Sequence, residues 1–419
     1  MWKARDAEAG NVLSPLTPHA QGQDMDRDER AEPNEAILPH TCEALRCACL
    51  PCLTCASVAP IICCWQCTPR GHPTWTVPFE AAITVLRTAT ANLARSYCVL
   101  RCLTDPPVGV VPTWLPTIPR NVGCKANTVA PHEGSWFWPA SGPRTSCWCC
   151  CPGYPGHPQR QANLQRAPRV ILYFHGGAFA LCSSKTHRGL IMKLVHETGA
   201  TVLCPDYRRP PEHPWPTPVK DCLETYTWLL NHGNVDPHKI IFAGDSAGGG
   251  LVLAVLSAAK AAGLPLPSGG VLWSPWVDLT DSCSGSWTSN QRTDFIPRDL
   301  AAKIALDYAG TNTLAAVSPG NVDLTGFPPL LIEVGECECL HDQVVKFAHR
   351  ASGLGVSVDL HVAPGMVHVF PLFAAFAGAD AEPNKVFKRL GWFIDTLLAA
   401  NSETSTRFRG QLASEAKSK

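Results

Sequence analysis

The sequence predicts an α/β fold in which a mostly parallel sheet is covered by helices on both faces. From about residue 167 to residue 400, short apolar runs alternate with segments that have helical periodicity. The runs are apolar at nearly every position and rich in β-branched residues, as expected of strands buried on both faces. Such alternation is typical of parallel strands joined by helical crossovers. The chain has 419 residues, which is ample for a core of this kind.

The predicted elements follow one another closely along the chain. The short apolar runs predict strands at 169–174, 201–205, 240–243, 271–274, 330–334 and 356–362. Longer periodic segments predict helices at 247–262, 344–351 and 385–398. A further helix begins near Thr217, which we expect to cap it, because Pro218 suits the first helical position. One face of this helix carries the apolar residues Val219, Cys222, Leu223, Tyr226 and Leu230.

Composition sets limits on the partners of the protein. Lys and Arg together number 35, as do Asp and Glu, so the formal net charge is zero. A neutral chain has no global basic field, and we therefore predict no nucleic-acid partner. The sequence gives no prediction of the oligomeric state.

Cysteine is distributed very unevenly. Fifteen of the 21 cysteines precede residue 152, and most of these lie in clusters. Scattered thiols in an ordinary α/β sequence behave as small buried hydrophobic residues, so we predict no disulfide framework from the remaining six, Cys182, Cys204, Cys222, Cys283, Cys337 and Cys339.

The N-terminal third is predicted to be organised differently from the rest. Residues 1–70 form a disordered, Cys-rich leader, and residues 71–166 form a cap region followed by an irregular linker. Residues 47–66 carry no charge, and three interpretations compete for them. The first interpretation is a zinc site built from Cys-x-x-Cys pairs, the second is a membrane-associated or acylated segment, and the third is a leader without any site. The protein is accordingly expected to be cytoplasmic or membrane-associated. Residues 401–419 are predicted to be a disordered tail.

Residues 244–248 read Gly-Asp-Ser-Ala-Gly and directly follow the apolar run 240–243. A strand, a sharp turn carrying a serine and a helix of small residues together predict a nucleophile elbow with Ser246 at its tip. Side chains at Gly244 and Gly248 would collide with the neighbouring helix and strand.

A serine nucleophile needs a base, and the base needs an acid that orients it. The predicted base is His368, in a loop between the last predicted strand and the last helix. For the acid, Glu336, Glu338 and Asp342 all follow the strand at 330–334, and each could instead cap the next helix. The chain order serine, acid, histidine is the order found in α/β-hydrolases.

The oxyanion of acyl transfer also needs hydrogen-bond donors. The backbone N–H groups of Gly177, Ala178 and Ala247 are the candidates, because glycine lets the backbone approach the developing charge. An ordinary tight turn after a strand is the alternative interpretation of His175-Gly176-Gly177. Asp245, next to the nucleophile, is expected to fix the elbow by hydrogen bonding.

Four stretches resemble the hormone-sensitive-lipase-like family of α/β-hydrolase esterases in order and spacing. They are Tyr173–Phe179 (YFHGGAF), Asp206–Pro216 (DYRRPPEHPWP), Gly244–Gly249 (GDSAGG) and Trp273–Leu279 (WSPWVDL). The resemblance covers about residues 167–400 and implies an α/β-hydrolase catalytic domain with a helical cap. Residues 75–91 match the N-terminal cap more weakly.

The resemblance implies Ser246, Glu338 and His368 as the catalytic triad, with Asp342 as a reserve acid. The family has Asp-Pro-Leu-x-Asp where this chain has Glu338-Cys339-Leu340-His341-Asp342, so both the acid and the proline differ. Ala178 replaces a third glycine. His175, Gly176 and Asp245 are assigned supporting roles, and an Arg208/Glu212 pair is expected to stiffen the proline-rich loop that braces the oxyanion turn.

In this family the substrate pocket is built from a cap, which here corresponds to residues 75–120 and 280–312. Trp287, Phe295 and Ile296 are its expected wall residues. The predicted function is hydrolysis of a hydrophobic small-molecule ester by a serine carboxylesterase that needs no metal or organic cofactor. The alternatives are a receptor on the same fold that binds a small ligand without hydrolysing it, as some plant hormone receptors do, and an inactive product with a defective cap.

Overall fold

The computed structural model describes residues 75–93, 122–126, 130–139, 164–165, 167–281 and 285–417. All of them belong to one structural unit, residues 48–419. The leader at 1–70, including the uncharged segment 47–66, lies outside the described residues, as does most of the linker between 94 and 166. The interpretations of those segments therefore stay predictions.

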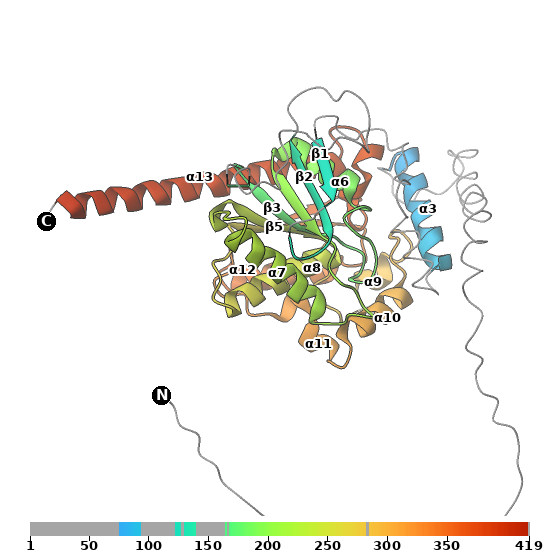
Figure 1. Ribbon diagram of the computed structural model, residues 1–419. Coiled ribbons are helices and arrows are strands. Elements are labelled where there is room, and N and C mark those ends of the chain that lie inside the picture. Colours follow the sequence, from blue (N-terminus) through green and yellow to red (C-terminus); the bar gives the residue numbers. More distant parts are fainter. Residues whose placement is uncertain are drawn as a thin grey trace, which may run out of the picture. The chain divides into compact units, whose positions relative to one another are not determined.

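An eight-stranded sheet organises the described residues and confirms the predicted α/β class (Figure 1). The strand order is β1-β2-β4-β3-β5-β6-β7-β8, and all neighbours from β4 to β8 are parallel. The strands are β1 (Val122–Ala126), β2 (Gly134–Pro139), β3 (Val170–Phe174), β4 (Thr201–Pro205), β5 (Ile240–Asp245), β6 (Gly269–Trp273), β7 (Leu330–Gly335) and β8 (Val358–Ala363).

Helices cover both faces of the sheet. The α-helices are α3 (Val77–Leu93), α6 (Arg188–Thr198), α7 (Thr217–Asn231), α8 (Ala247–Ala261), α9 (Ser286–Ser289), α10 (Arg298–Ala309), α11 (Leu314–Val317), α12 (His341–Gly353) and α13 (Glu382–Lys417). The short 3-10 helices in the described part of the chain are η1 (Pro237–Lys239), η2 (Pro319–Asn321) and η3 (Phe370–Phe376). Buried side chains of α7, α8 and α12 share one core cluster, and those of α3, α6 and α13 share the other.

Strand β3 shows how the two cores arise. Its side chains point alternately to opposite faces, so that Leu172 and Phe174 join the cluster under α7 and α8 while Ile171 and Tyr173 join the cluster under α6 and α13. All five residues of β3 are buried. The near-continuous apolar runs in the sequence therefore reflect strands buried on both faces.

The structure corrects several boundaries. Strands β1 and β2 lie within 71–166 and extend the sheet by two antiparallel strands, where the sequence predicts only a cap and an irregular linker. Pro216, and not Thr217, is the N-cap of α7. The last helix continues to Lys417 through the predicted disordered tail, whose Glu, Ala, Arg and Lys residues favour a helical backbone.

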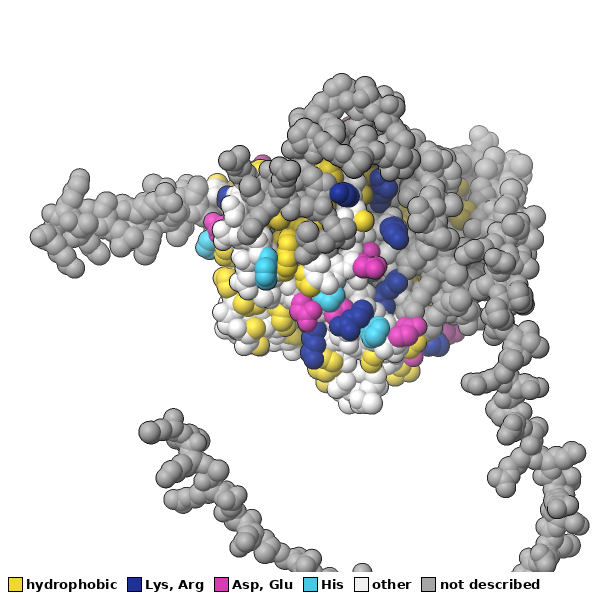
Figure 2. All heavy atoms as spheres, in the orientation of Figure 1, with side chains coloured by type: hydrophobic (Ala, Val, Ile, Leu, Met, Phe, Trp, Pro, Cys, Tyr) yellow, Lys and Arg dark blue, Asp and Glu magenta, His cyan; other side chains and the backbone are white. Residues whose placement is uncertain are grey.

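Two further observations concern the surface charge and the hydrophobicity of the helices. Figure 2 shows acidic and basic side chains intermixed on the visible face of the described part, in keeping with the zero net charge. No α-helix among the described residues is both long and apolar enough to cross a bilayer.

Parallel topology brings distant loops to one edge of the sheet. The turns that follow β3, β5, β6, β7 and β8 all leave the carboxyl ends of parallel strands. In open α/β sheets this edge is where ligands bind. The stretches that contain Gly177, Ser246, Ser274, Glu338 and His368 all begin there.

Candidate active site

Ser246 occupies a strained turn between β5 and α8. Its backbone has φ 54° and ψ −123°, a conformation that costs free energy for a residue with a side chain. The Ser246 N–H donates to the carbonyl of Trp273 at 2.8 Å, which ties the turn to β6. A Cβ added at Gly248 would lie 2.0 Å from the carbonyl oxygen of Phe174, so only glycine permits this approach. These features form the strand–turn–helix context of a nucleophile elbow.

The structure places His368 against the hydroxyl of Ser246. Nε2 of His368 lies 2.9 Å from Oγ of Ser246, although 122 residues separate the two in the sequence. Both residues are buried, with Ser246 9% exposed. The distance is within the range over which a base takes a proton from a nucleophile.

Glu338 stands on the other side of His368. Its Oε1 lies 3.5 Å from Nδ1 of His368. Both atoms are buried, and neither has a hydrogen-bond partner elsewhere among the described residues. The second oxygen, Oε2, accepts hydrogen bonds from Oγ of Ser274 at 2.6 Å and from the N–H of Gly335 at 2.8 Å. The carboxylate is thus anchored by one oxygen and faces the imidazole with the other.

The electrostatic surroundings make His368 a stronger base. Burial alone would lower the pKa of His368, because it disfavours the imidazolium. The carboxylates of Glu338, Asp294 and Asp245 outweigh burial and raise the pKa above its ordinary value of 6.5, with Glu338 contributing most. A proton on His368 is therefore held more firmly than on a solvent-exposed histidine.

The other two candidate acids are engaged elsewhere. Glu336 accepts a hydrogen bond from the N–H of Gly365 at 2.8 Å. Asp342 accepts from the N–H of Ser286 at 2.8 Å and lies 2.9 Å from Nδ1 of His341, with its side chain 57% exposed. Among the three candidate acids, the structure brings Glu338 to the imidazole.

The turn after β3 has an unusual backbone. Gly177, Ala178 and Phe179 have φ values of 110°, 53° and 65°, and the carbonyl of Gly177 accepts from the N–H groups of Ala180 and Leu181. The N–H groups of Gly177 and Ala178 donate no hydrogen bond within the described residues. Ala247 is the first residue of α8, so its N–H has no partner inside the helix. Three donors are thus available at the predicted oxyanion site.

Asp245 connects the elbow to this turn. Its Oδ1 accepts from the N–H of Gly176 at 3.0 Å and from the hydroxyl of Tyr173 at 2.7 Å. Its Oδ2 lies 3.1 Å from Nε2 of His187. Burial would raise the pKa of Asp245, but the charge of His187 and the hydrogen bonds outweigh it and lower the pKa. The same pairing outweighs burial at His187 and raises the pKa of that imidazole. The expected hydrogen-bonding role of Asp245 is seen in these contacts.

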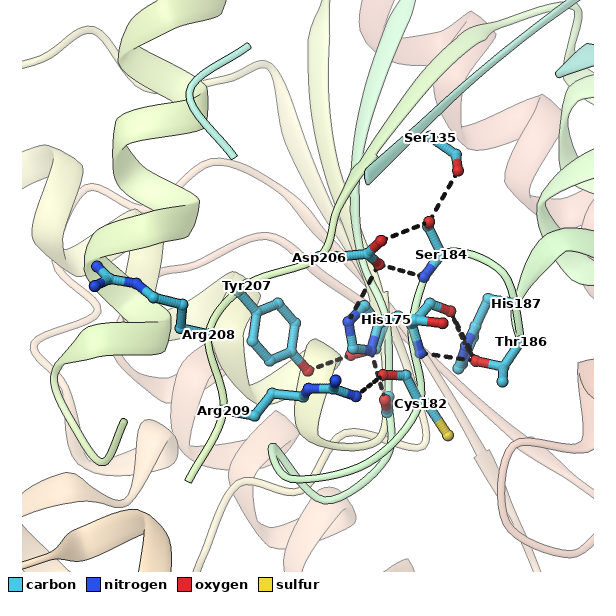
Figure 3. Close-up of polar contacts among 12 residues, drawn as sticks. Ser135, His175, Cys182, Ser184, Thr186, His187, Asp206, Tyr207, Arg208 and Arg209 are labelled. Atoms are coloured by element: carbon cyan, nitrogen blue, oxygen red, sulfur yellow. Dashed lines mark hydrogen bonds and ion pairs between the residues drawn. The ribbon is translucent and has the colours of Figure 1, made fainter. Parts of the chain in front are cut away.

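His175 braces the turn as a neutral side chain. Its Nδ1 lies 2.8 Å from the carbonyl of Gly176, which can only accept, so Nδ1 carries the proton. Burial, reinforced by the charge of His187, lowers the pKa of His175 to about 3. Figure 3 shows Tyr207 beside this imidazole, with its hydroxyl donating to the His175 carbonyl at 2.8 Å. The two rings are stacked, with centroids 4.3 Å apart.

The proline-rich loop holds the turn, and an ion pair different from the one predicted ties this loop to α7. In Figure 3, Arg209 donates to the carbonyl of Cys182, and Asp206 accepts from the backbone and hydroxyl of Ser184. Arg208 pairs with Asp221 of α7 at 2.7 Å and not with Glu212. Asp221 is fully buried and lies 13 residues further along the chain, so local spacing did not reveal it.

The predicted wall residues occupy different environments. Phe295 is half-buried, and its ring centroid lies 5.9 Å from that of His368, so it borders the site. Trp287 is buried in the larger core cluster, and Ile296 packs against the same cluster. The assignment of Trp287 and Ile296 to the pocket wall therefore stays a prediction.

One cluster of metal-ligand residue types occurs among the described residues. His132, Asp221 and Glu224 bring ligand atoms within 4.8 Å of one another. His132 already lies 2.8 Å from Glu224, and Arg208 binds both carboxylate oxygens of Asp221. A hydrogen bond and an ion pair therefore already engage the residues of this cluster.

Sequence reasoning missed two groups next to the triad candidates. Ser274 lies in the quoted motif Trp273–Leu279, but its hydroxyl was not linked to Glu338. Asp294 precedes the predicted wall residue Phe295 and is buried beneath His368, whose N–H donates to it at 3.2 Å. No spacing in the sequence indicates a contact across 74 residues.

Known proteins resemble this chain in sequence. A family model of the alpha/beta hydrolase fold matches residues 171–372. An acetyl-hydrolase of Streptomyces hygroscopicus is 43% identical over 206 residues, which are 48% of this chain and 68% of the relative. A carboxylesterase of Mycobacterium tuberculosis is 32% identical over 223 residues, which are 51% of this chain and 70% of the relative.

Solved structures resemble it as well. A mutant of the esterase E40 is 32% identical, with a TM-score of 0.64 over 77% of this chain and 98% of that one. An esterase of the bacterial hormone-sensitive lipase family is 30% identical, with a TM-score of 0.59 over 82% of this chain and 98% of that one. The strand order, the elbow and the sequence relatives agree. The chain belongs to the hormone-sensitive-lipase-like family of α/β-hydrolase esterases.

Proposed function

We propose that this carboxylesterase-type hydrolase cleaves hydrophobic small-molecule esters through an acyl-enzyme on Ser246. The distance of 2.9 Å between Nε2 of His368 and Oγ of Ser246 carries the proposal. In the first step His368 removes the serine proton while Oγ attacks the ester carbonyl. Glu338 faces Nδ1 at 3.5 Å and stabilises the imidazolium that forms.

The oxyanion is held by the N–H groups of Gly177, Ala178 and Ala247. Each such donor contributes about 3 kcal/mol to the stability of the transition state. The start of α8 adds the positive end of a helix dipole at Ala247. His368 then protonates the leaving alcohol, and a water molecule repeats the cycle on the acyl-enzyme.

Apolar side chains near the triad support a hydrophobic substrate. Phe295 borders His368, where the leaving alcohol is protonated. On the oxyanion side, Ala178 and Cys182 pack against a cluster of Ala180, Leu181 and Ile304, which links the turn to α10. Pockets lined mainly by such groups bind apolar ligands. The acetyl-hydrolase relative favours a short acyl group as the first one to assay.

Trapping the acyl-enzyme tests this proposal. The purified protein is mixed with p-nitrophenyl acetate in a stopped-flow instrument and then quenched in acid for peptide mass analysis. We expect a burst of p-nitrophenolate of about one equivalent and an acetyl group on the peptide that contains Ser246. Hydrolysis with the label on another side chain would refute the mechanism. Binding without turnover would favour the receptor alternative. A protein that does not fold would favour the alternative of an inactive product with a defective cap.

Ser274 is expected to support catalysis through Glu338. Ser274→Ala removes a hydroxyl that donates to Oε2 of Glu338 at 2.6 Å and accepts from the N–H of Val369 at 3.0 Å. The carboxylate and the base loop both lose an anchor, and we expect kcat to fall about tenfold with little change in KM. Steady-state kinetics of Ser274→Ala and of the control Ser352→Ala measure the effect. Ser352 is an exposed residue on α12. An equal loss in both variants would contradict this role.

The raised pKa of His368 predicts the pH dependence of the reaction. Only the neutral imidazole accepts the serine proton, so kcat/KM is lost as the pH falls through the pKa of His368 in the free enzyme. Because nearby carboxylates raise that pKa, the midpoint of the acid limb should lie above pH 6.5, with a plateau at higher pH. A pH profile with a non-ionising ester measures it. A midpoint below pH 6.5 would be inconsistent with the role of these carboxylates.

A further inference from the structure

We propose that Asp294 is a positioning residue that joins the loop carrying the acid Glu338 to the loop carrying the base His368. The inference rests on the proposed triad and adds a second carboxylate to it. Asp294 lies in the segment between α9 and α10 and is 2% exposed. It comes from neither of the two loops that it contacts.

The contacts of Asp294 are divided between its two oxygens. Oδ1 accepts from the N–H of His368 at 3.2 Å and from the N–H of Phe295 at 2.9 Å. Oδ2 accepts from the N–H of Cys339 at 2.7 Å, directly after Glu338 in the chain. One carboxylate therefore fixes the backbone of the base and the backbone next to the acid. The gap of 3.5 Å between Glu338 and His368 depends on that spacing.

The cap helix holds the same segment from outside. Arg87 of α3 donates through Nε to the carbonyl of Asp294 at 3.0 Å and through a second nitrogen to the carbonyl of Thr293. Thr90 of α3 donates to the carbonyl of Phe295 at 2.9 Å. These hydrogen bonds hold the main chain at Asp294 in place. Its side chain can therefore hold the two loops at a fixed distance from each other.

Charge gives Asp294 an effect beyond packing. Acceptance of three backbone N–H bonds favours the ionised form of a carboxylate. Burial and the nearby Glu338 act in the opposite direction and raise the pKa of Asp294, while His368 lowers it. The groups that act on His368 are then the carboxylates of Glu338, Asp294 and Asp245, all of which favour the imidazolium. Removal of the Asp294 charge should make His368 easier to deprotonate.

Asp294→Asn tests the proposal, with Asp299→Asn as the matched control. Asparagine has one acceptor oxygen, so its amide donor must face either the N–H of Cys339 or those of His368 and Phe295. We expect kcat for p-nitrophenyl acetate to fall on the order of tenfold and the acid limb of kcat/KM to move about one pH unit lower. Asp299 is exposed in the first turn of α10, and its variant should match the wild type.

Two further variants complete the test. Asp294→Glu keeps the charge and should restore the position of the acid limb even where kcat stays low. Should Asp294→Asn fail to fold, Asp294→Ser keeps one short oxygen acceptor and carries the same pH measurement. If the acid limb of kcat/KM does not move in any neutral Asp294 variant that folds, and kcat equals that of Asp299→Asn, the inference about Asp294 is wrong. The proposed function is unaffected by that result. Hydrolysis by the Ser246→Ala variant at the wild-type rate would instead overturn the proposed function.

Discussion

Ser246→Ala is expected to reduce kcat for p-nitrophenyl acetate by about 10⁴-fold or more, because the variant has no oxygen that can form the acyl-enzyme. The imidazole of His368, which lies 2.9 Å from the missing hydroxyl, would then have no proton to take. The residual rate would come from the oxyanion donors and from substrate binding.

The fold should tolerate this change. Among the described residues, the side chain of Ser246 hydrogen-bonds only to His368, while its backbone N–H and carbonyl hold the turn to Trp273 and Trp276. Alanine keeps those backbone bonds and has a Cβ like serine, so the strained φ of 54° is no less accessible to it. The thermal midpoint is therefore expected to stay near that of the wild type.

Steady-state kinetics, a thermal melt and a fluorophosphonate labelling assay together check the prediction. Ser352→Ala serves as the control, since Ser352 is exposed on α12 and far along the chain from the elbow. Wild type and control should react with the probe, and Ser246→Ala should not. A variant that melts normally and keeps a tenth of the wild-type rate would show that another group performs the attack.

Local sequence signals were sufficient for the elbow and for the parallel strands of the sheet. The run 240–243 is a buried strand, and Ser246 follows it at the start of a helix, as the pattern of glycines predicted. These features depend on residues a few positions apart, where backbone conformation and steric fit are decided. The position of His368 after the last predicted strand already made it the expected base, and the resemblance to the family then selected Glu338 from three candidate acids. No local rule could bring these two side chains together across 30 residues.

Long-range contacts account for what the sequence did not reveal. Arg208 pairs with the buried Asp221 of α7 because the helix presents that carboxylate toward the loop, whereas Glu212 is only an acidic residue of the same loop. Asp294 has no local pattern at all, since its partners His368 and Cys339 come from loops after two other strands. Strands β1 and β2 were missed because neither is a run of β-branched apolar residues, since β1 reads VGCKA and β2 reads GSWFWP, and because both are separated from the main alternation.

Glu338→Gln should lower kcat by about 10³–10⁴-fold while Asp342→Asn stays near the wild type. The anchored oxygen of Glu338 accepts from the N–H of Gly335 at 2.8 Å and the hydroxyl of Ser274 at 2.6 Å, so the glutamine oxygen must take that place. Its NH₂ group then points at Nδ1 of His368. A donor there forces the proton of the imidazole onto Nε2, the atom that has to accept the proton of Ser246.

Asp342→Asn offers a carboxylate-to-amide change four residues away without this consequence. The Asp342 oxygen that accepts from the N–H of Ser286 can be kept as the amide oxygen, and the side chain is largely exposed. Kinetics of both variants on p-nitrophenyl acetate, with pH profiles, separate the two acids. Loss of the Glu338 charge should also shift the acid limb of kcat/KM to lower pH, because the imidazolium loses its strongest partner. Loss of activity in Asp342→Asn together with an active Glu338→Gln would assign the acid to Asp342, whose side chain would then have to leave its contacts with Ser286 and His341 to face His368.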